Sequence, residues 1–559
     1  MKTNRHLIIN ISLAILSASL CLYFSRTPFF WSLESLSLDL LFRVRSAQTA
    51  PRQDKNIVII EVTDADLVRS GVWPWPRARY REMCELLSDL GAKQIFFDYL
   101  FPIPDELGQD DDFARVIKSS GNVYFPYIFT SKDLTSSQIT APVPALANAA
   151  RGLGASIIFP DMDGKWRRLP LLFDQNGNQY EHIALRMARD DLGMNIKTLT
   201  PHHLVLTNGT DDVRIPLLEG HKMLLNWHGT WSETFHHYDF LELVQAYHDQ
   251  KNQKIPAIDL AGIKGKICLV GVTATGLYDN KITPLEASFP GVGVIATALG
   301  NINNRDFLYV LPFWTWALIV YALILLLPFS IFSGSANREG PFLLLLASVI
   351  ILSYIAFLNG IVFNPSVPLI ALLTGYFFIS LMNSTRMTVE KKLLLAMATT
   401  DGMTGLYNFR YLKEALGEEC HRVHTGQATP FCVLICDIDH FKKLNDNFGH
   451  QTGDLVLKNA AAILKNSVRG GDLVARYGGD ELLVLLRNIP LESACVVAEK
   501  IRANIADMEL SCHGQRLEVT VSLGVAQFKP GADDPARLIE NADKCLYFAK
   551  ENGRNRVCS

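Results

Sequence analysis

Charged residues are scarce in this chain of 559 residues, where Asp, Glu, Lys and Arg together make up 19%, against about 25% in an ordinary soluble protein. No excess of positive charge accompanies this scarcity, because 53 Lys and Arg stand against 56 Asp and Glu and the formal net charge is −3. A nucleic-acid binder needs clustered basic residues that displace counterions from phosphates. The composition therefore argues against nucleic acid as a partner. Cysteine is also sparse, with 10 residues, which is too few for a scaffold held by disulfides.

What the sequence has instead is a set of long apolar runs. They are Leu7–Phe24, Leu311–Phe332 and the uncharged segment 340–385, which is long enough for two helices joined by a turn at 359–365. A helix needs about 20 largely apolar residues to cross the hydrocarbon core of a bilayer. We therefore predict four transmembrane helices. A cleaved signal peptide is the alternative for the first run, but Cys21–Phe24 lacks the small residues of a cleavage site.

Basic residues in the short flanks of these runs predict the orientation in the membrane. They are Lys2 and Arg5 before the first run, Arg338 after the second, and Arg386, Lys391 and Lys392 after the fourth. All of them lie on one side if the chain crosses the bilayer four times. We predict that the N-terminus and residues 386–559 are cytoplasmic and that residues 25–306 lie outside. Seven of the ten cysteines fall in the predicted cytoplasmic part, where thiols stay reduced.

The predicted outer segment alternates strand-like apolar runs with amphipathic helical ones. The runs are 57–60, 94–97 and 266–270 for strands, and 79–90 and 111–119 for helices. This alternation is typical of an α/β domain. The loop Gly271–Gly276 has the glycine spacing of a phosphate loop but lacks its Lys, so we reject that interpretation. Asn176-Gly177 predicts a hairpin turn. The rigid, proline-containing segment Trp73–Pro76 fits two interpretations equally well, a corner that packs against the rest of the domain or one wall of a ligand-binding site.

The outer segment resembles the second class of CHASE-type extracytoplasmic sensor domains over about 280 residues. The motifs that carry this resemblance are Asp39–Arg43, Val62–Asp64 with Gly71–Arg77, Gly91–Phe101, Asp161–Gly164 with Arg167-Arg168, and Gly265–Gly271 with Thr283-Pro284. The resemblance implies a sensor of an extracytoplasmic signal that the sequence does not name. A purely structural or dimerising role is the alternative.

Two acidic clusters carry the chemistry of the predicted cytoplasmic part. Asp437-Ile-Asp439 follows the apolar run Phe431–Cys436, and Asp480-Glu481 follows Gly478-Gly479. The pattern predicts two strands, the second of them in a hairpin with a two-glycine turn. Carboxylates at strand ends are ligands that Mg²⁺ prefers when it also binds phosphate oxygens. We predict two-metal phosphoryl or nucleotidyl transfer here, although a solvent-facing turn would explain Gly-Gly-Asp-Glu alone.

The segment from Thr399 to Val557 resembles the GGDEF family of diguanylate cyclases. Six motifs carry this resemblance in register: Asp401–Asn408, Asp437–Asp446, Gly449–Asp454, Arg476–Glu481, Ser522–Val525 and Ala542–Asn555. The resemblance implies an α+β palm-like nucleotide-cyclase fold, GTP as substrate and cyclic di-GMP as product. It also implies a homodimer, because each domain holds one GTP. A short helix at 388–400, with Val389, Leu393 and Ala396 at helical spacing, would carry the signal from the spans to this domain.

The same resemblance implies roles for single residues. Asp437, the carbonyl of Ile438, Asp480 and Glu481 would hold two Mg²⁺ ions, with Mn²⁺ as an alternative, and Asp480 and Glu481 would be catalytic. The GTP-binding set would be His440 and Phe441 through their amides, Lys442, Asn445, Asp454, Gly478, Gly479, Lys550 and Arg554. Within it, Asn445 and Asp454 would recognise guanine, and Lys442, Lys550 and Arg554 would bind the triphosphate. Arg469, Asp472 and Lys500 would form an inhibitory product site, for which a surface ion pair is the alternative.

One residue departs from the signature of the family, because Leu482 occupies the position of its usual Phe. We expect the Leu482 side chain to face the core and the metal ligands to remain intact. We also expect the enzyme to be slower than one with Phe at this position.

These expectations describe a multidomain membrane protein with an α/β extracytoplasmic sensor, four transmembrane helices and an α+β cyclase domain. The predicted boundaries are 1–24 for the N-terminal tip and first helix, 25–306 for the sensor, 307–385 for helices two to four, 386–400 for the signalling linker, and 401–559 for the GGDEF domain. The resemblance implies a sensor-regulated, Mg²⁺-dependent and feedback-inhibited diguanylate cyclase in the bacterial inner membrane. A catalytically weak or silent receptor for GTP or cyclic di-GMP is the alternative.

Overall fold

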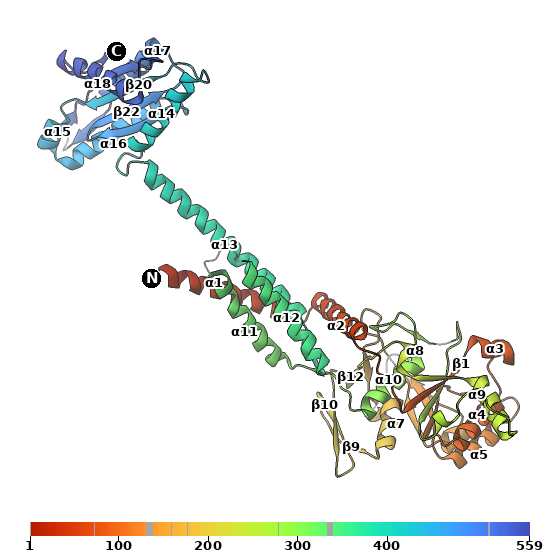
Figure 1. Cartoon of the computed structure of the whole chain (residues 1–559). Helices are drawn as coiled ribbons and strands as arrows, with labels where there is room; N and C mark the ends of the chain where they lie inside the picture. The colour runs from red at the N-terminus through yellow and green to blue at the C-terminus, as the bar shows by residue number, and fades with distance from the viewer. Residues whose placement is uncertain are drawn as a thin grey trace. The chain divides into compact units, whose positions relative to one another are not determined.

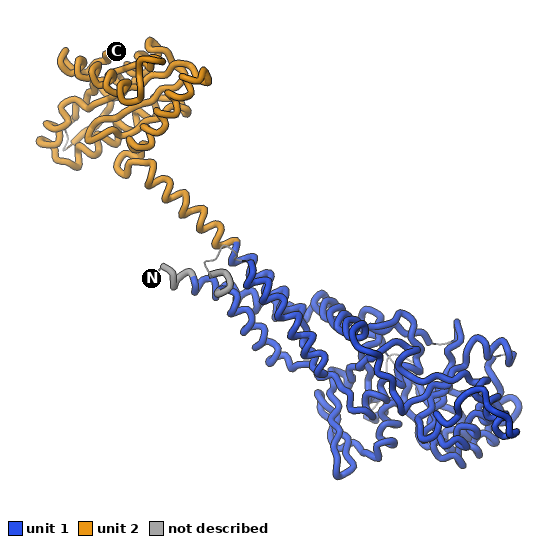
Figure 2. The backbone as a smooth tube through the Cα atoms, in the orientation of Figure 1, with its two compact units in different colours: residues 1–380 blue, residues 381–559 orange. Residues whose placement is uncertain are grey.

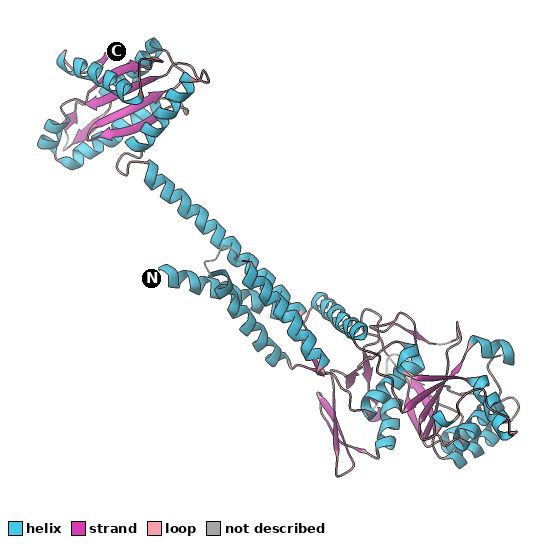
Figure 3. Cartoon of the chain, viewed as in Figure 1, coloured by secondary structure: helices cyan, strands magenta, loops and turns pink. Residues whose placement is uncertain are grey.

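The computed structural model describes residues 2–71, 73–129, 138–157, 159–175, 177–277, 279–332, 339–512 and 515–559. These residues form two compact units, Met1–Ser380 and Leu381–Ser559 (Figure 2). Arg338 and Asn176, on which two of the sequence predictions depend, lie outside the described residues. The elements carry the labels of Figure 1, and Figure 3 shows their types.

A mainly parallel sheet forms the centre of the sensor part of the first unit (Figure 3). Its strands are, in spatial order, β13 (His236–Asp239), β1 (Ile57–Val62), β14 (Ile267–Val272), β2 (Gln94–Phe97) and β3 (Val123–Phe129), with β4 (Ile139–Thr140) and β5 (Gly152–Ala155) both pairing with β3. The strands consist of continuous apolar runs because both faces of the sheet are covered. Val58 and Ile60 of β1 pack into one hydrophobic core, and Ile57 and Ile59 pack into the other.

Helices cover the two faces of this sheet. The core that contains Ile57 and Ile59 includes residues of α7 (Ile183–Leu192) and α10 (Gly291–Asn303). The core that contains Val58 and Ile60 includes residues of α4 (Arg77–Asp89), α5 (Asp110–Ser120) and α9 (Phe240–Lys251). The strands and helices predicted from the alternating pattern are therefore confirmed, with ends shifted by two residues or fewer. The predicted hairpin is also present, because β7 (Leu172–Gln175) pairs antiparallel with β8 (Asn178–Glu181).

The apolar runs of the first unit form long helices. Among the described residues, three helices are long and apolar enough to cross a membrane, and they contain Leu7–Phe24 in α1 (Lys2–Phe24), Gly340–Leu358 in α12 and Ser366–Thr399 in α13. The segment of the remaining predicted span forms the helix α11 (Phe313–Phe332), but its described apolar part, Phe313–Pro328, is shorter and is not one of these three. Ser17 joins α1 to α13, because its hydroxyl lies 2.6 Å from that of Thr374 and donates to the carbonyl of Ala371 at 3.0 Å.

The second unit is a six-stranded sheet between two helical layers. Its spatial order is β19 (Tyr407–Asn408), β21 (Leu473–Gly478), β22 (Glu481–Leu486), β20 (Cys432–Ile438), β25 (Val521–Gln527) and β26 (Val557–Cys558). Cys432 and Leu434 of β20 face a core that includes α16 (His450–Ser467) and α17 (Leu491–Ala506), whereas Val433 and Ile435 face α14 (Phe409–His424) and α18 (Pro535–Glu551). The structure therefore confirms the predicted α+β class.

Helix α13 continues without a break from the membrane-type segment to Thr399. The short helix predicted at 388–400 is thus the end of a 34-residue helix rather than a separate element. Its last turn is fixed to the second unit, because the carbonyl of Ala398 accepts hydrogen bonds from Asn408 at 2.8 Å and Arg410 at 3.1 Å.

Candidate active site

The two acidic clusters meet across the pairing of β20 with β22. Asp437 lies directly opposite Glu481 in this antiparallel pair, and opposite Ser522 in the pair of β20 with β25. The preceding residues of β20 are all buried, so the strand delivers Asp437 to the end of the sheet, where its exposure is 8%. The register thus brings together two residues that are 44 positions apart in the chain.

Arg476 fixes the glycine turn that carries Asp480. Its Nε and Nη2 donate to the carbonyl of Gly479 at 3.0 and 2.7 Å, and its Nη1 contacts the carboxylate of Asp401 at 3.3 Å. Gly479 has a φ of +35°, in a region that residues with a side chain rarely adopt. The sequence prediction did not include Arg476 or Asp401 in the site, although both lie in the quoted motifs.

The carboxylates of this cluster repel one another. Burial raises the pKa of Asp437 above its ordinary value, with the charges of Asp480 and Asp439 adding to the effect, while Lys550 opposes it from 2.8 Å. Burial likewise raises the pKa of Glu481, and Asp437 and Asp480 contribute further. Negative charges held together in this way favour a cation as the neutralising partner.

The described residues contain no group of three or more His, Cys, Asp or Glu side chains that is already arranged as a metal site. The chemistry of the donors nevertheless fits Mg²⁺, which binds oxygen ligands and completes its shell with water and phosphate oxygens. Asp437, Asp480 and Glu481 supply carboxylates, and Ile438 supplies a backbone carbonyl on the same strand end.

The residues predicted to recognise guanine are brought together by a close approach of two helices. Asn445 lies on α15 (Phe441–Phe448), and Asp454 lies on the first turns of α16. A Cβ atom added to Gly453 would lie 1.8 Å from Oδ1 of Asn445. Only a glycine at position 453 leaves room for the Asn445 side chain. The amide of Asn445 on α15 therefore lies beside the turn of α16 that carries the Asp454 carboxylate.

The residues predicted to bind the triphosphate line the same end of the domain. His440 is the N-cap of α15 with a φ of 58°, so the amides of the first turn of this helix are free of intrahelical acceptors. Lys442 is exposed on that turn, and Lys550 contacts Asp437. Arg554 is exposed and has a φ of 60°.

Asp439 holds this C-terminal segment in place, which the sequence prediction did not anticipate. Its buried carboxylate accepts hydrogen bonds from the hydroxyls of Thr520 at 2.8 Å and Ser522 at 2.7 Å. It also accepts from the backbone amide of Asn555 at 3.0 Å. The segment that carries Arg554 is thereby tied to the same strand end as Asp437.

Comparison with known proteins agrees with this geometry. A family model described as the CHASE2 domain matches residues 13–331, more than half of the chain, and a model described as "Diguanylate cyclase, GGDEF domain" matches residues 398–556. The chain is a CHASE2-domain protein with a GGDEF domain.

Individual relatives share the cyclase-type part. Diguanylate cyclase A of Treponema denticola is 38% identical over 171 residues, which are 30% of this chain and 46% of the relative. Response regulator PleD of Caulobacter vibrioides is 41% identical over 165 residues, which are 29% of this chain and 36% of the relative. The chain thus covers less than half the length of these curated relatives.

Among solved structures, the coiled coil and GGDEF domain of DgcB from Caulobacter crescentus, in complex with c-di-GMP, is 31% identical. The match covers 33% of this chain and 98% of that chain, with a TM-score of 0.32.

The predicted product site lies on a turn of the GGDEF domain before β21. The carboxylate of Asp472 accepts from the backbone amides of Arg469 at 2.9 Å and Arg487 at 3.0 Å. The side chains of Arg469 and Lys500 are exposed. Within the described residues Arg469 forms no ion pair with Asp472, so the alternative of a surface ion pair is not observed.

Leu482, the departure from the GGDEF signature, is fully buried in the core between the sheet and α16 and α17. The expectation that its side chain faces the core is confirmed.

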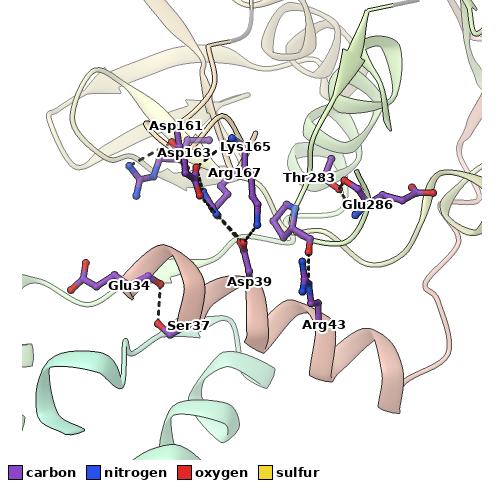
Figure 4. A network of polar contacts seen from close by, with 12 residues as sticks. Glu34, Ser37, Asp39, Arg43, Asp161, Asp163, Lys165, Arg167, Thr283 and Glu286 are labelled. Carbon is purple, nitrogen blue, oxygen red and sulfur yellow. Dashed lines mark hydrogen bonds and ion pairs between the residues drawn. The ribbon is translucent and has the colours of Figure 1, made fainter. Parts of the chain in front are cut away.

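A buried ionic network ties helix α2 (Pro28–Gln48), which follows α1, to the rest of the CHASE2 domain (Figure 4). Asp39 of α2 is 2% exposed and forms two parallel contacts with Arg167, at 2.6 and 2.9 Å. Asp161 and Asp163 contact the other side of the same guanidinium at 3.2 and 2.7 Å, and Lys165 contacts Asp39 at 2.5 Å. Several motifs that carry the CHASE2 resemblance therefore converge in space.

Proposed function

We propose that this chain is a membrane-bound diguanylate cyclase whose activity the CHASE2 domain regulates. The observation that carries the proposal is the pairing of Asp437 with Glu481 beside the Gly478–Glu481 turn. The similarity to proteins named as diguanylate cyclases supports the same reaction class.

In the proposed reaction, each of two GTP molecules uses its 3′-hydroxyl to attack the α-phosphate of the other. Two phosphodiester bonds form, two pyrophosphates leave, each hydroxyl gives up its proton, and the product is cyclic di-GMP. One GGDEF domain holds one GTP, so two copies of the chain must bring their domains face to face. Catalysis then depends mainly on positioning and on stabilising charge.

The chain's own residues divide this task between two ends of the nucleotide. Asn445 and Asp454 would complement the hydrogen-bonding edge of guanine, since an amide and a carboxylate match its donors and acceptor. Lys442, Lys550 and Arg554 would neutralise the triphosphate together with the free amides at His440 and Phe441. Asp437, Ile438, Asp480 and Glu481 would hold two Mg²⁺ ions, which lower the negative charge of the phosphates when bound.

We further propose the finer organisation predicted from the sequence. The chain crosses the bacterial inner membrane four times, with the CHASE2 domain outside and the GGDEF domain in the cytoplasm. The boundaries are 1–24, 25–306, 307–385, 386–400 and 401–559, and Arg469, Asp472 and Lys500 form a site through which cyclic di-GMP inhibits its own synthesis. The exposed Arg469 and Lys500 side chains, which can accept an anionic ligand, support this site.

The test is to incubate the purified full chain with GTP and Mg²⁺ and to separate the products by chromatography. We expect cyclic di-GMP from the parent chain and from Asp507→Asn, a matched control at an exposed acid after α17. Asp480→Asn should abolish the product. Equal product from Asp480→Asn would remove Asp480 from the site, and no product from any chain would favour the silent receptor.

A further inference from the structure

A cavity lies where the membrane-type helices meet the CHASE2 domain. Its volume is about 300 Å³. Three apolar helices reach it with their ends. Ser25 and Arg26 follow the last residue of α1, Phe313 and Trp316 lie in the first turn of α11, and Asn364 lies just before the first residue of α13. The CHASE2 domain closes the cavity with Arg168, Leu218 and Leu224. The cavity therefore lies at the membrane surface.

Two guanidinium groups line this cavity without a strong acidic partner. Arg168 has Asp161 at 3.8 Å, a longer contact than any that Arg167 makes with its three aspartates. Arg26 lies 5.1 Å from the centre of the Phe313 ring and forms no ion pair with a described residue. The charge of Arg167 is neutralised inside the protein, whereas Arg26 and Arg168 are available to an external anion.

Glu34 of α2 is the third charged group that lines the cavity. Its side chain extends away from the network around Asp39 (Figure 4). Burial raises the pKa of Glu34 to about 7, although the nearby Arg168 opposes this shift. Around neutral pH the carboxyl group is protonated in a large share of the molecules and can donate a hydrogen bond to an anionic oxygen.

The rest of the lining is apolar. Leu38, Leu224, Val310, Leu311 and Trp316 contribute to it, with Phe313 beside Arg26. Aromatic residues at the ends of membrane helices lie at the level of the lipid headgroups. An apolar wall next to two cations matches a molecule with an anionic head and an alkyl tail.

We propose that this cavity binds an anionic amphiphile, an anionic phospholipid of the surrounding membrane, with its phosphate between Arg26 and Arg168 and its chain along the wall formed by Leu38, Leu224 and Trp316. Arg168 suits this role because a guanidinium can donate two parallel hydrogen bonds to phosphate. The ligand would contact α1, α2 and the CHASE2 domain at once, which places it at the joint between the sensor and the membrane. The proposal does not depend on the cyclase activity.

The experiment reconstitutes the full chain into bilayers of phosphatidylcholine and phosphatidylglycerol with equal chains, and then measures by native mass spectrometry which lipid stays bound after extraction. We expect the parent chain to retain phosphatidylglycerol in preference to phosphatidylcholine. The double variant Arg26→Gln/Arg168→Gln should retain about tenfold less, because it loses charge-assisted hydrogen bonds. Arg26→Lys/Arg168→Lys should recover part of the binding, because it keeps the charge but loses the forked geometry.

Two further variants distinguish a specific loss of lipid binding from a general loss of structure. Arg115→Gln removes an exposed arginine of α5 outside the cavity and should retain the lipid like the parent chain. Leu218→Trp narrows the cavity and leaves both arginines in place, so it should lose the lipid as well. Equal retention of the two lipids by the parent chain, or unchanged retention by the double Gln variant, would overturn the proposal. Binding of inorganic phosphate without retention of lipid would also overturn it, because the ligand would then be a free anion.

Discussion

The contact between Gly453 and Asn445 allows the guanine site to be tested with a single methyl group. In Gly453→Ala the new Cβ would lie 1.8 Å from Oδ1 of Asn445, whereas non-bonded heavy atoms rest at about 3.5 Å. The Asn445 side chain must therefore move by more than about 1.5 Å. The backbone can stay as it is, because Gly453 lies in α16 with a φ that alanine readily adopts.

The expected result separates substrate binding from stability. Replacing a helical glycine by alanine is favourable by up to about 1 kcal/mol, so we expect the folded domain to tolerate Gly453→Ala. If Asn445 binds guanine, one or two hydrogen bonds worth about 0.5–1.5 kcal/mol each are lost. The KM for GTP should then rise by about 2- to 160-fold, with kcat changing much less.

The assay measures initial rates of cyclic di-GMP formation against GTP concentration, and thermal unfolding of each variant. Gly417→Ala is the matched control, because Gly417 also lies inside a helix of the GGDEF domain, α14, and its added Cβ meets no atom within 4 Å. We expect that control to gain stability and to keep its KM. An unchanged KM in Gly453→Ala would refute the assignment of Asn445 to the guanine.

Three further predictions concern other parts of the chain. Arg476→Lys should lower kcat/KM by at least about tenfold without unfolding the domain, because lysine cannot contact both the turn and Asp401; initial rates test this, and full activity would show that the turn needs no such support. His182→Asn should reduce the acid sensitivity of the CHASE2 domain. Burial lowers the pKa of His182 from 6.5 to about 3, so below pH 6.5 the unfolded chain binds a proton that the folded chain does not. The free energy of unfolding is therefore about 2 kcal/mol lower at pH 5 than above pH 6.5. The unfolding midpoint of the parent chain should fall more than that of the variant between pH 7.5 and pH 5, and equal falls would contradict this. Arg469→Ala should weaken inhibition by added cyclic di-GMP with little effect on stability, whereas Asp472→Ala should also destabilise its turn, and an unchanged inhibition curve for Arg469→Ala would exclude the proposed product site.

The local part of the active site could be predicted from the sequence. Apolar runs bounded by acidic residues predicted that Asp437 and Glu481 lie at strand ends, and the two glycines predicted the turn between β21 and β22; the structure adds that the strands of Asp437 and Glu481 pair directly. The supporting contacts could not be predicted in the same way. Asp439 binds Thr520 and Asn555, which are 81 and 116 positions away, and no periodic pattern specifies such pairs.

In the sensor, too, the local elements could be predicted from the sequence and the long-range contacts could not. Alternating apolar and amphipathic runs predicted the strands and helices of the sheet, because burial on both faces produces continuous apolar strands. Helix α2 was not predicted as a separate element, since its mixed sequence Pro28–Gln48 follows an apolar span directly. Its buried face depends on Asp39 and Arg167, which are 128 positions apart.

This network also determines where the first unit can bend. Pulling α2 away from the rest of the CHASE2 domain would separate the buried Asp39 from both Arg167 and Lys165, and parting a buried ion pair is strongly unfavourable. The helix should therefore move with the sensor as one rigid piece. The connection between α1 and α2 consists of only residues 25–27. A rearrangement of the sensor would then reach α1 directly through this three-residue connection, as a tilt or twist of that helix.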